Sequence, residues 1–160
     1  MYMYNFNLVL FTKQLLFAFI YKNPFNFKNK IWTHIAFIIS ISGLIIELLI
    51  LLSYKITITI NLTSFLGLIF LLIGQFLNYS VYKELGYYGV YYGGQYGYTI
   101  KWSNNFPYNT SIKNPQYIGA YMSYIGVFFI LYQHISLNVL LRTIILMSCS
   151  YYFISYIESK

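Results

Sequence analysis

Charged residues are scarce in this chain, and acidic residues are the scarcest. Only 8% of its 160 residues are charged, and the three acids are all glutamates. A soluble domain carries about 25% charged residues, so this chain cannot cover a globule with solvated side chains. Because 59% of the residues are hydrophobic and the mean hydropathy is +0.59, the composition excludes a soluble domain and predicts a multi-span membrane protein.

Cysteine and histidine are nearly missing as well. The one cysteine, Cys149, lies in an apolar run. A single cysteine excludes an intramolecular disulfide and argues against a cysteine-based metal site. The two histidines, His34 and His134, have few potential metal ligands near them. We therefore expect no metal ion in this protein.

Basic residues outnumber acidic ones and give a net charge of +7. A membrane protein usually directs such an excess toward the cytoplasmic leaflet. We therefore expect no nucleic-acid partner, while the oligomeric state stays open.

Apolar runs predict an all-α integral membrane protein, folded as a single domain over residues 1–160, with three or four transmembrane helices. A membrane helix needs about 20 apolar residues. Residues 6–21 are interrupted by Lys13 and Gln14, so we expect an interfacial or re-entrant helix there. The predicted membrane helices are residues 32–52, 62–79, 118–132 and 137–157, and whether 118–157 crosses as one span or two stays open.

Lysines orient these predicted helices. One group precedes the first span and another follows the second; they are Lys22, Lys28 and Lys30, then Lys83, Lys101 and Lys113. By the positive-inside rule, the side that carries both groups is cytoplasmic. If the last two runs cross and return, Glu158 shares that side with the region 80–117.

Residues 80–117 form a polar, turn-rich region between the apolar runs. Glycine lets a backbone approach a ligand closely, and proline fixes the direction of the chain. The region therefore predicts a site at the membrane surface. It holds three short motifs, which are Leu85-Gly86 with Gly89, Gly93 and Gly97, then Phe106-Pro107-Tyr108-Asn109, and then Asn114-Pro115-Gln116-Tyr117-Ile118-Gly119.

The order and spacing of these motifs resemble the phospholipid N-methyltransferases, membrane enzymes that convert phosphatidylethanolamine to phosphatidylcholine. That family carries Leu-Gly-x-x-Gly-x-x-x-Gly, then Phe-Pro-Phe-Asn, then Asn-Pro-x-Tyr-x-Gly, and Tyr108 replaces the second phenylalanine. The resemblance implies S-adenosylmethionine as the methyl donor and a phospholipid amine as the acceptor. It also implies an enzyme of the endoplasmic reticulum membrane whose active site faces the cytosol.

The resemblance also implies which residues bind the cofactor. The family's Gly-x-Gly falls on Leu72, Ile73 and Gly74, and its Glu-Glu pair falls on Ile157 and Glu158, so this chain keeps one residue of each pair. The family's Gly-Asp-Tyr becomes Gly93-Gly94-Gln95 and loses its acid. Glu158 either holds the cofactor's ammonium or ribose hydroxyls or is an ordinary solvated residue, and Gly74 either meets the ligand or serves close helix packing. The implied cofactor-binding set is Leu72, Ile73, Gly74, Pro115, Tyr117, Ile157 and Glu158.

Tyrosines of the same region are candidates for the lipid headgroup. Aromatic faces attract an amine that approaches a quaternary ammonium, although the same rings are typical of an interfacial aromatic belt. Glu84, the nearest acid, is interpreted as a helix-end charge beside Lys83, so the catalytic base stays unassigned. The predicted substrate-binding residues are Gly89, Tyr92, Gly93, Tyr96, Phe106, Pro107 and Asn109.

Glu47 differs from the other acids because it lies in the middle of a predicted span. An acid at that depth is costly and is a functional candidate by default. The alternative is a hydrogen-bonded group that holds helices together, with Gln75 as its expected partner.

Two other functions stay open at this point. One is a related membrane methyltransferase of the prenylcysteine carboxyl type, although the Phe-Pro-Tyr-Asn motif favours a lipid enzyme. The other is a degenerate, non-catalytic lipid-binding protein, which the altered Gly-x-Gly and Glu-Glu positions favour. A pocket on which Gly74 and Glu158 converge would favour the enzyme.

Overall fold

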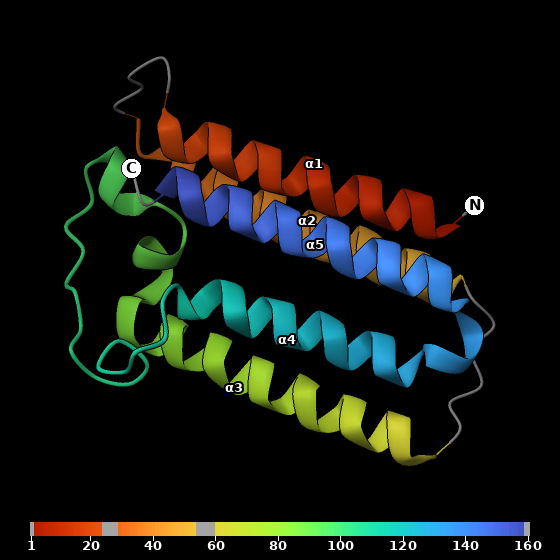
Figure 1. The fold of residues 1–160 in the computed structure, drawn as a ribbon. Coiled ribbons are helices and arrows are strands. Elements are labelled where there is room, and N and C mark those ends of the chain that lie inside the picture. The colour runs from red at the N-terminus through yellow and green to blue at the C-terminus, as the bar shows by residue number, and fades with distance from the viewer. Residues whose placement is uncertain (1, 24–28, 54–59, 159–160) are drawn as a thin grey trace.

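The fold of this chain is a bundle of helices. A computed structural model describes residues 2–23, 29–53 and 60–158. Within those ranges all regular elements are helices, which confirms the predicted all-α class (Figure 1). They are α1 (Tyr2–Lys22), α2 (Ile31–Leu52), α3 (Leu62–Val90), η1 (Gly93–Tyr96), α4 (Pro115–Ile130), η2 (Tyr132–His134) and α5 (Leu137–Glu158).

The helices form two layers. One layer contains α1, which packs against both α2 and α5, and the other contains the closely packed pair α3 and α4. Contacts between α4 and α5 join the layers, and Figure 1 shows η1 at the same end of the bundle as the C-terminal end of α5. The apolar contact between layers includes Phe6 and Leu10 of α1, Phe128 of α4 and Met147 of α5, all of which are buried.

Within the described residues, α2, α3 and α5 are long and apolar enough to cross a membrane. Their outward faces carry exposed leucine and isoleucine, as lipid-facing surfaces do. Helix α4 has 16 residues and is about 24 Å long at 1.5 Å per residue. Helix α1, expected as an interfacial or re-entrant helix, lies in the bundle beside α2 and α5.

Helix α3 extends beyond its predicted end at Tyr79 and continues to Val90. It begins at a capping box, in which Asn61 Oδ1 accepts from Ser64 N at 2.8 Å and Asn61 N donates to Ser64 Oγ at 2.9 Å. It changes direction at Gly86, whose φ of 65° lies in the left-handed region that favours glycine. The polar residues after Tyr79, where the predicted membrane span ends, therefore belong to a kinked extension of the same helix.

Small residues let α3 and α4 approach closely. A Cβ atom on Gly67 would lie 2.6 Å from Gly126 O, and one on Gly74 would lie 2.5 Å from Gly119 O. Both distances are too short for a side chain, so glycine is required for this helix contact, as is common between membrane helices. Of the two interpretations of Gly74, the structure shows the packing role.

Candidate functional site

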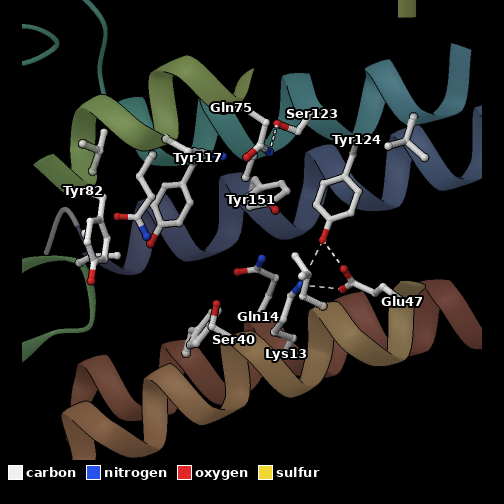
Figure 2. Close-up of a pocket in the computed structure, with 18 of the residues that line it drawn as sticks. Lys13, Gln14, Ser40, Glu47, Gln75, Tyr82, Tyr117, Ser123, Tyr124 and Tyr151 are labelled. Atoms are coloured by element: carbon white, nitrogen blue, oxygen red, sulfur yellow. Dashed lines mark hydrogen bonds and ion pairs between the residues drawn. The ribbon is translucent and has the colours of Figure 1, made fainter. Parts of the chain in front are cut away.

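A cavity of about 460 Å³ lies between the two layers. Ligand pockets commonly fall between about 300 and 1,000 Å³. One wall comes from α2 and the opposite wall from α3, while α1, α4 and α5 close the cavity between them (Figure 2). Most of the lining is apolar or aromatic, and its polar side chains include Lys13, Gln14, Ser40, Glu47, Gln75, Asn78, Gln116 and Ser123.

At one end of the cavity, two tyrosines hold the carboxylate of Glu158. Tyr92 Oη donates to Glu158 Oε1 at 2.8 Å, and Tyr117 Oη donates to the same oxygen. Tyr21 Oη donates to the backbone carbonyl of Glu158 at 2.7 Å and so fixes the end of α5. Tyr92 and Tyr117 line the cavity. The expectation that the 80–117 region and Glu158 share one surface is confirmed.

The path of the chain after α3 places Tyr92 at this end. Tyr92 has a φ of 60°, which is rare for a bulky residue and stores strain. The next turn, η1, is anchored because Tyr96 Oη donates to the backbone carbonyl of Ile20 on α1. Gly97 ends η1 with a φ of 88°, a conformation that favours glycine. The glycine-rich motif therefore serves to turn the chain so that Tyr92 reaches Glu158.

The Asn-Pro motif places Tyr117 in a similar way. Asn114 has a φ of 50°, and Pro115 follows as the first residue of α4, where a missing N–H costs nothing. Asn114 Nδ2 donates to Ser155 Oγ, which ties the start of α4 to α5. Tyr117 then lies within hydrogen-bonding reach of Glu158, so the motif assembles this end of the cavity.

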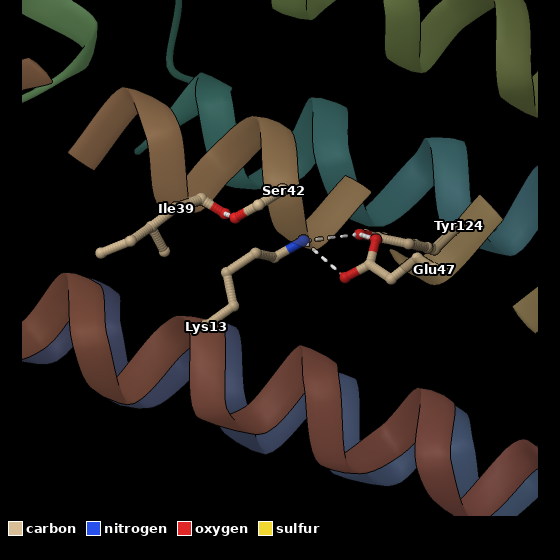
Figure 3. Close-up of polar contacts among 5 residues, drawn as sticks. All are labelled: Lys13, Ile39, Ser42, Glu47 and Tyr124. Atoms are coloured by element: carbon tan, nitrogen blue, oxygen red, sulfur yellow. Dashed lines mark hydrogen bonds and ion pairs between the residues drawn. The ribbon is translucent and has the colours of Figure 1, made fainter. Parts of the chain in front are cut away.

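At the other end of the cavity, Lys13 and Glu47 form a buried ion pair. Lys13 Nζ lies 2.6 Å from Glu47 Oε1 and donates to Tyr124 Oη at 3.1 Å, and Tyr124 Oη donates to Glu47 Oε2 (Figure 3). The expected partner of Glu47 was wrong. Gln75 lies in the opposite layer, where its Nε2 donates to Ser123 Oγ of α4 at 2.9 Å.

Sequence reasoning missed Lys13, Gln14 and Tyr124 as cavity residues. The available signal was the polar pair Lys13-Gln14 inside an apolar run, together with Glu47 inside another. Two opposite charges in separate membrane helices are expected to pair. Tyr124 carried no such signal, because the chain has 20 tyrosines.

Most of the other predicted site residues lie away from the cavity. Leu72 is 61% exposed and Ile73 is also exposed on the outer face of α3, while Ile157 packs against the core. Pro115 is buried at the start of α4, and Tyr96 is buried against α1. Their predicted ligand contacts, and those of Gly74, stay predictions.

The Phe-Pro-Tyr-Asn motif anchors the loop to α3. The rings of Phe106 and Phe76 lie 5.7 Å apart, Pro107 is fully buried, and Asn109 is exposed. Burial, and then the nearby charge of Glu84, raise the pKa of Tyr108 to about 12. Gly89 packs against Leu85 within α3, and Gly93, the first residue of η1, packs against Tyr88. The five predicted substrate-binding residues of this paragraph all lie outside the cavity lining, and their substrate contacts stay predictions. They are Gly89, Gly93, Phe106, Pro107 and Asn109.

Glu84 also lies outside the cavity lining. It accepts hydrogen bonds from Asn105 Nδ2 at 3.1 Å and from Ser103 Oγ, and so it holds the loop to α3. Glu84 was expected at a helix end beside Lys83, whereas in the structure it lies within α3, two residues before the kink at Gly86. Across residues 2–23, 29–53 and 60–158, no three metal-ligating side chains gather at one place.

These features define a helical membrane protein with a tyrosine-lined cavity and a carboxylate that accepts hydrogen bonds from two of the lining tyrosines. Residues 62–160 match the family described as phospholipid methyltransferase, and the chain belongs to that family. It is similar to the phosphatidyl-N-methylethanolamine N-methyltransferase of Arabidopsis thaliana, with 39% identity over 88 residues that cover 54% of this chain and 48% of that protein. The chain thus spans about half the length of this curated relative. No solved structure matches the chain.

Proposed function

We propose that this protein transfers methyl groups from S-adenosylmethionine to the headgroup amine of phosphatidylethanolamine and of its mono- and dimethyl derivatives, toward phosphatidylcholine. The family match supports phospholipid over prenylcysteine as the acceptor. Lys22 follows Tyr21, which bonds to Glu158, and Lys30 Nζ lies over the ring of Tyr98 beside η1, so these lysines lie at the end of the bundle that holds Glu158. Their position supports an active site facing the cytosol. The resemblance to the family implies the endoplasmic reticulum membrane.

The observation that carries this proposal is the cluster of Tyr92, Tyr117 and Glu158. Both phenols donate to one carboxylate oxygen of Glu158, so that group is held in a fixed position beside the cavity. A fixed carboxylate suits the ammonium or the ribose hydroxyls of S-adenosylmethionine, and tyrosine faces suit its sulfonium cation. The residues present therefore fit this cofactor.

The cavity also supports entry of a lipid from the bilayer. Two residues of its α2 wall, Leu44 and Leu48, are 58% and 52% exposed, and Tyr82 of its α3 wall is exposed as well. Because α2 and α3 are membrane-spanning candidates, this opening faces the acyl chains rather than the cytosol. A phospholipid would then slide its headgroup between α2 and α3 without leaving the membrane.

Catalysis in such a site is mainly a matter of position. S-adenosylmethionine, when bound, supplies a methyl group that is already activated. The tyrosine faces at the Glu158 end would hold the lipid amine in line with the methyl group of the cofactor. Alignment of this kind makes a bimolecular reaction effectively unimolecular. The apolar lining, which includes Leu71 and Val81 of α3, excludes water and keeps the amine in its uncharged, nucleophilic form.

The proposal is tested by expressing the full chain in cells that lack their own phospholipid methylation. Membranes from these cells would be incubated with S-adenosylmethionine labelled in its methyl group, and the extracted lipids would be separated. Labelled mono-, di- or trimethylated phosphatidylethanolamine is the expected product. Its absence, under conditions where a known phospholipid methyltransferase works, would contradict the proposal.

One observation favours a second function, namely lipid binding without catalysis. Gly74 is occupied by packing against Gly119, and Leu72 faces outward, so the residues at the family's Gly-x-Gly positions do not reach the cavity. A lipid-binding protein without catalytic activity would retain phospholipid during purification and would produce no methylated lipid in the methyl-transfer assay.

A further inference from the structure

The end of the cavity opposite Glu158 holds polar groups that the methyl-transfer site does not use. Lys13 Nζ donates to Glu47 Oε1 and to Tyr124 Oη, which leaves one of its three N–H donors for the cavity. Gln14 lines the same cavity, is 3% exposed, and its Oε1 has no hydrogen-bond partner in the described part of the chain. Figure 2 shows Lys13 and Gln14 pointing from α1 toward the layer of α3 and α4.

Polar groups at this depth are costly unless they meet a partner or a ligand. The helices make room for them, since a Cβ atom on Gly43 of α2 would lie 2.7 Å from Cδ of Lys13. Lys13, Gln14 and Glu47 all precede residue 62, where the family match begins. The family motifs therefore do not account for this cluster.

We propose that Lys13, Gln14, Glu47 and Tyr124 form an ester subsite, which binds the ester carbonyl groups of a diacyl glycerophospholipid. The Lys13–Glu47 pair is neutral as a whole, so it suits a neutral acceptor better than a phosphodiester anion, which the carboxylate would repel. The donors are the remaining N–H of Lys13 and the NH₂ group of Gln14, which a rotation of the amide brings to the position of its unpartnered Oε1.

The position of the ester subsite fits a lipid whose headgroup lies near Glu158, and to that extent the inference rests on the proposed function. Phe17 and Tyr21 of α1 contact the ring of Tyr92, with centroids 6.1 and 5.7 Å away. Lys13 precedes them on α1, and at about 1.5 Å per residue it lies roughly 6 to 12 Å further along the helix. In a glycerophospholipid, the phosphodiester and glycerol separate the amine from the ester carbonyls, which lie deeper in the bilayer.

The test compares two lipids that differ only in these carbonyl groups. Phosphatidylethanolamine with two ester-linked chains would compete with a fluorescent phospholipid for the purified full chain in detergent micelles, without any methyl donor. The matched lipid with two ether-linked chains would be measured in the same way. The wild type is expected to bind the diester lipid about two- to tenfold more tightly, as for one hydrogen bond. Equal binding of the two lipids by the wild type would overturn the inference, whether or not any variant folds.

Variants assign the preference to the ester subsite. Gln14→Met keeps the length of the side chain but removes the amide, and it should bring the affinities for the two lipids together. Gln133→Met makes the same change at an exposed residue outside the cavity lining and should keep the preference. If Gln14→Met weakens both lipids equally, Gln14 contacts another part of the lipid and the inference is wrong.

Methyl transfer, measured separately, distinguishes this inference from the proposed function. An ester preference that depends on Gln14, without any methylated product, would support the subsite and contradict the enzyme. Methylated product formed without an ester preference would support the enzyme and contradict the subsite.

Discussion

The phenol of Tyr92 donates a 2.8 Å hydrogen bond to the carboxylate of Glu158, a residue 66 positions later in the chain. The bond joins the turn after α3 to the last residue of α5. A second phenol, from Tyr117 on α4, reaches the same oxygen. Three segments that are distant in sequence therefore meet at one carboxylate, beside a cavity large enough for a ligand.

Removal of these phenols should weaken cofactor binding while the bundle stays folded. Tyr92→Phe and Tyr117→Phe each remove one hydrogen bond that positions Glu158, so each should lower the affinity for S-adenosylmethionine about two- to tenfold. Isothermal titration of the purified protein measures this. Tyr152→Phe, at an exposed position of α5, is the matched control. Equal affinity in all three variants would show that the position of Glu158 does not matter for the cofactor.

Gly74→Ala should destabilise the protein through helix packing. The added Cβ would lie 2.5 Å from Gly119 O and from Ser123 Oγ, and overpacking of this kind costs about 1 to 3 kcal/mol. Thermal unfolding in detergent measures the loss. Leu72→Ala, on the lipid-facing side of the same helix, should cost much less. An unchanged unfolding temperature together with weaker cofactor binding would instead place Gly74 against the ligand.

The buried ion pair predicts non-additive effects. Lys13→Met leaves the Glu47 carboxylate buried without its cation, and removal of one partner typically costs about 3 to 5 kcal/mol. The double variant Lys13→Met with Glu47→Gln removes both charges, so it should be more stable than Lys13→Met alone. Unfolding of the single and double variants completes the cycle. Strictly additive losses would mean that the two charges do not interact.

Tyr108 predicts a loss of stability at alkaline pH. The pKa of Tyr108 is raised from 10.0 to about 12 because burial disfavours its charged form. Its contribution to stability is therefore complete below pH 10 and is lost as the pH rises from about 10 to 12. Tyr108→Phe should flatten the pH dependence of the unfolding temperature within that window. The same alkaline slope in wild type and variant would exclude Tyr108 as its source.

The membrane helices could be predicted from sequence because hydropathy reports burial in lipid directly. The positions of the lysines also predicted that the region 80–117 and Glu158 share one side, although not that Tyr92 bonds to Glu158. The extension of α3 past Tyr79 could not be predicted, because the charges of Lys83 and Glu84 indicate the end of a helix. In the structure, helical hydrogen bonding continues past them to the kink at Gly86.

The ion pair of Lys13 and Glu47 shows where sequence reasoning ends. Each residue stood out as a polar group in an apolar run, yet the pairing depends on how α1, α2 and α4 pack. Gln75 was the expected hydrogen-bond partner of Glu47, but it lies in the opposite layer and donates to Ser123 of α4. Gly43, which makes space for the lysine, carries no signal of that role before the helices are placed together.

We propose the Glu158 end of the cavity as the site of phospholipid methylation. Its most direct test uses the purified full chain in vesicles of phosphatidylethanolamine, with S-adenosylmethionine labelled in its methyl group. Wild type should form labelled N-methylated lipid, Glu158→Gln should form it at least tenfold more slowly, and Glu84→Gln, outside the cavity, should retain most of the rate. Equal rates for wild type and Glu158→Gln, or no labelled lipid from wild type, would contradict the account.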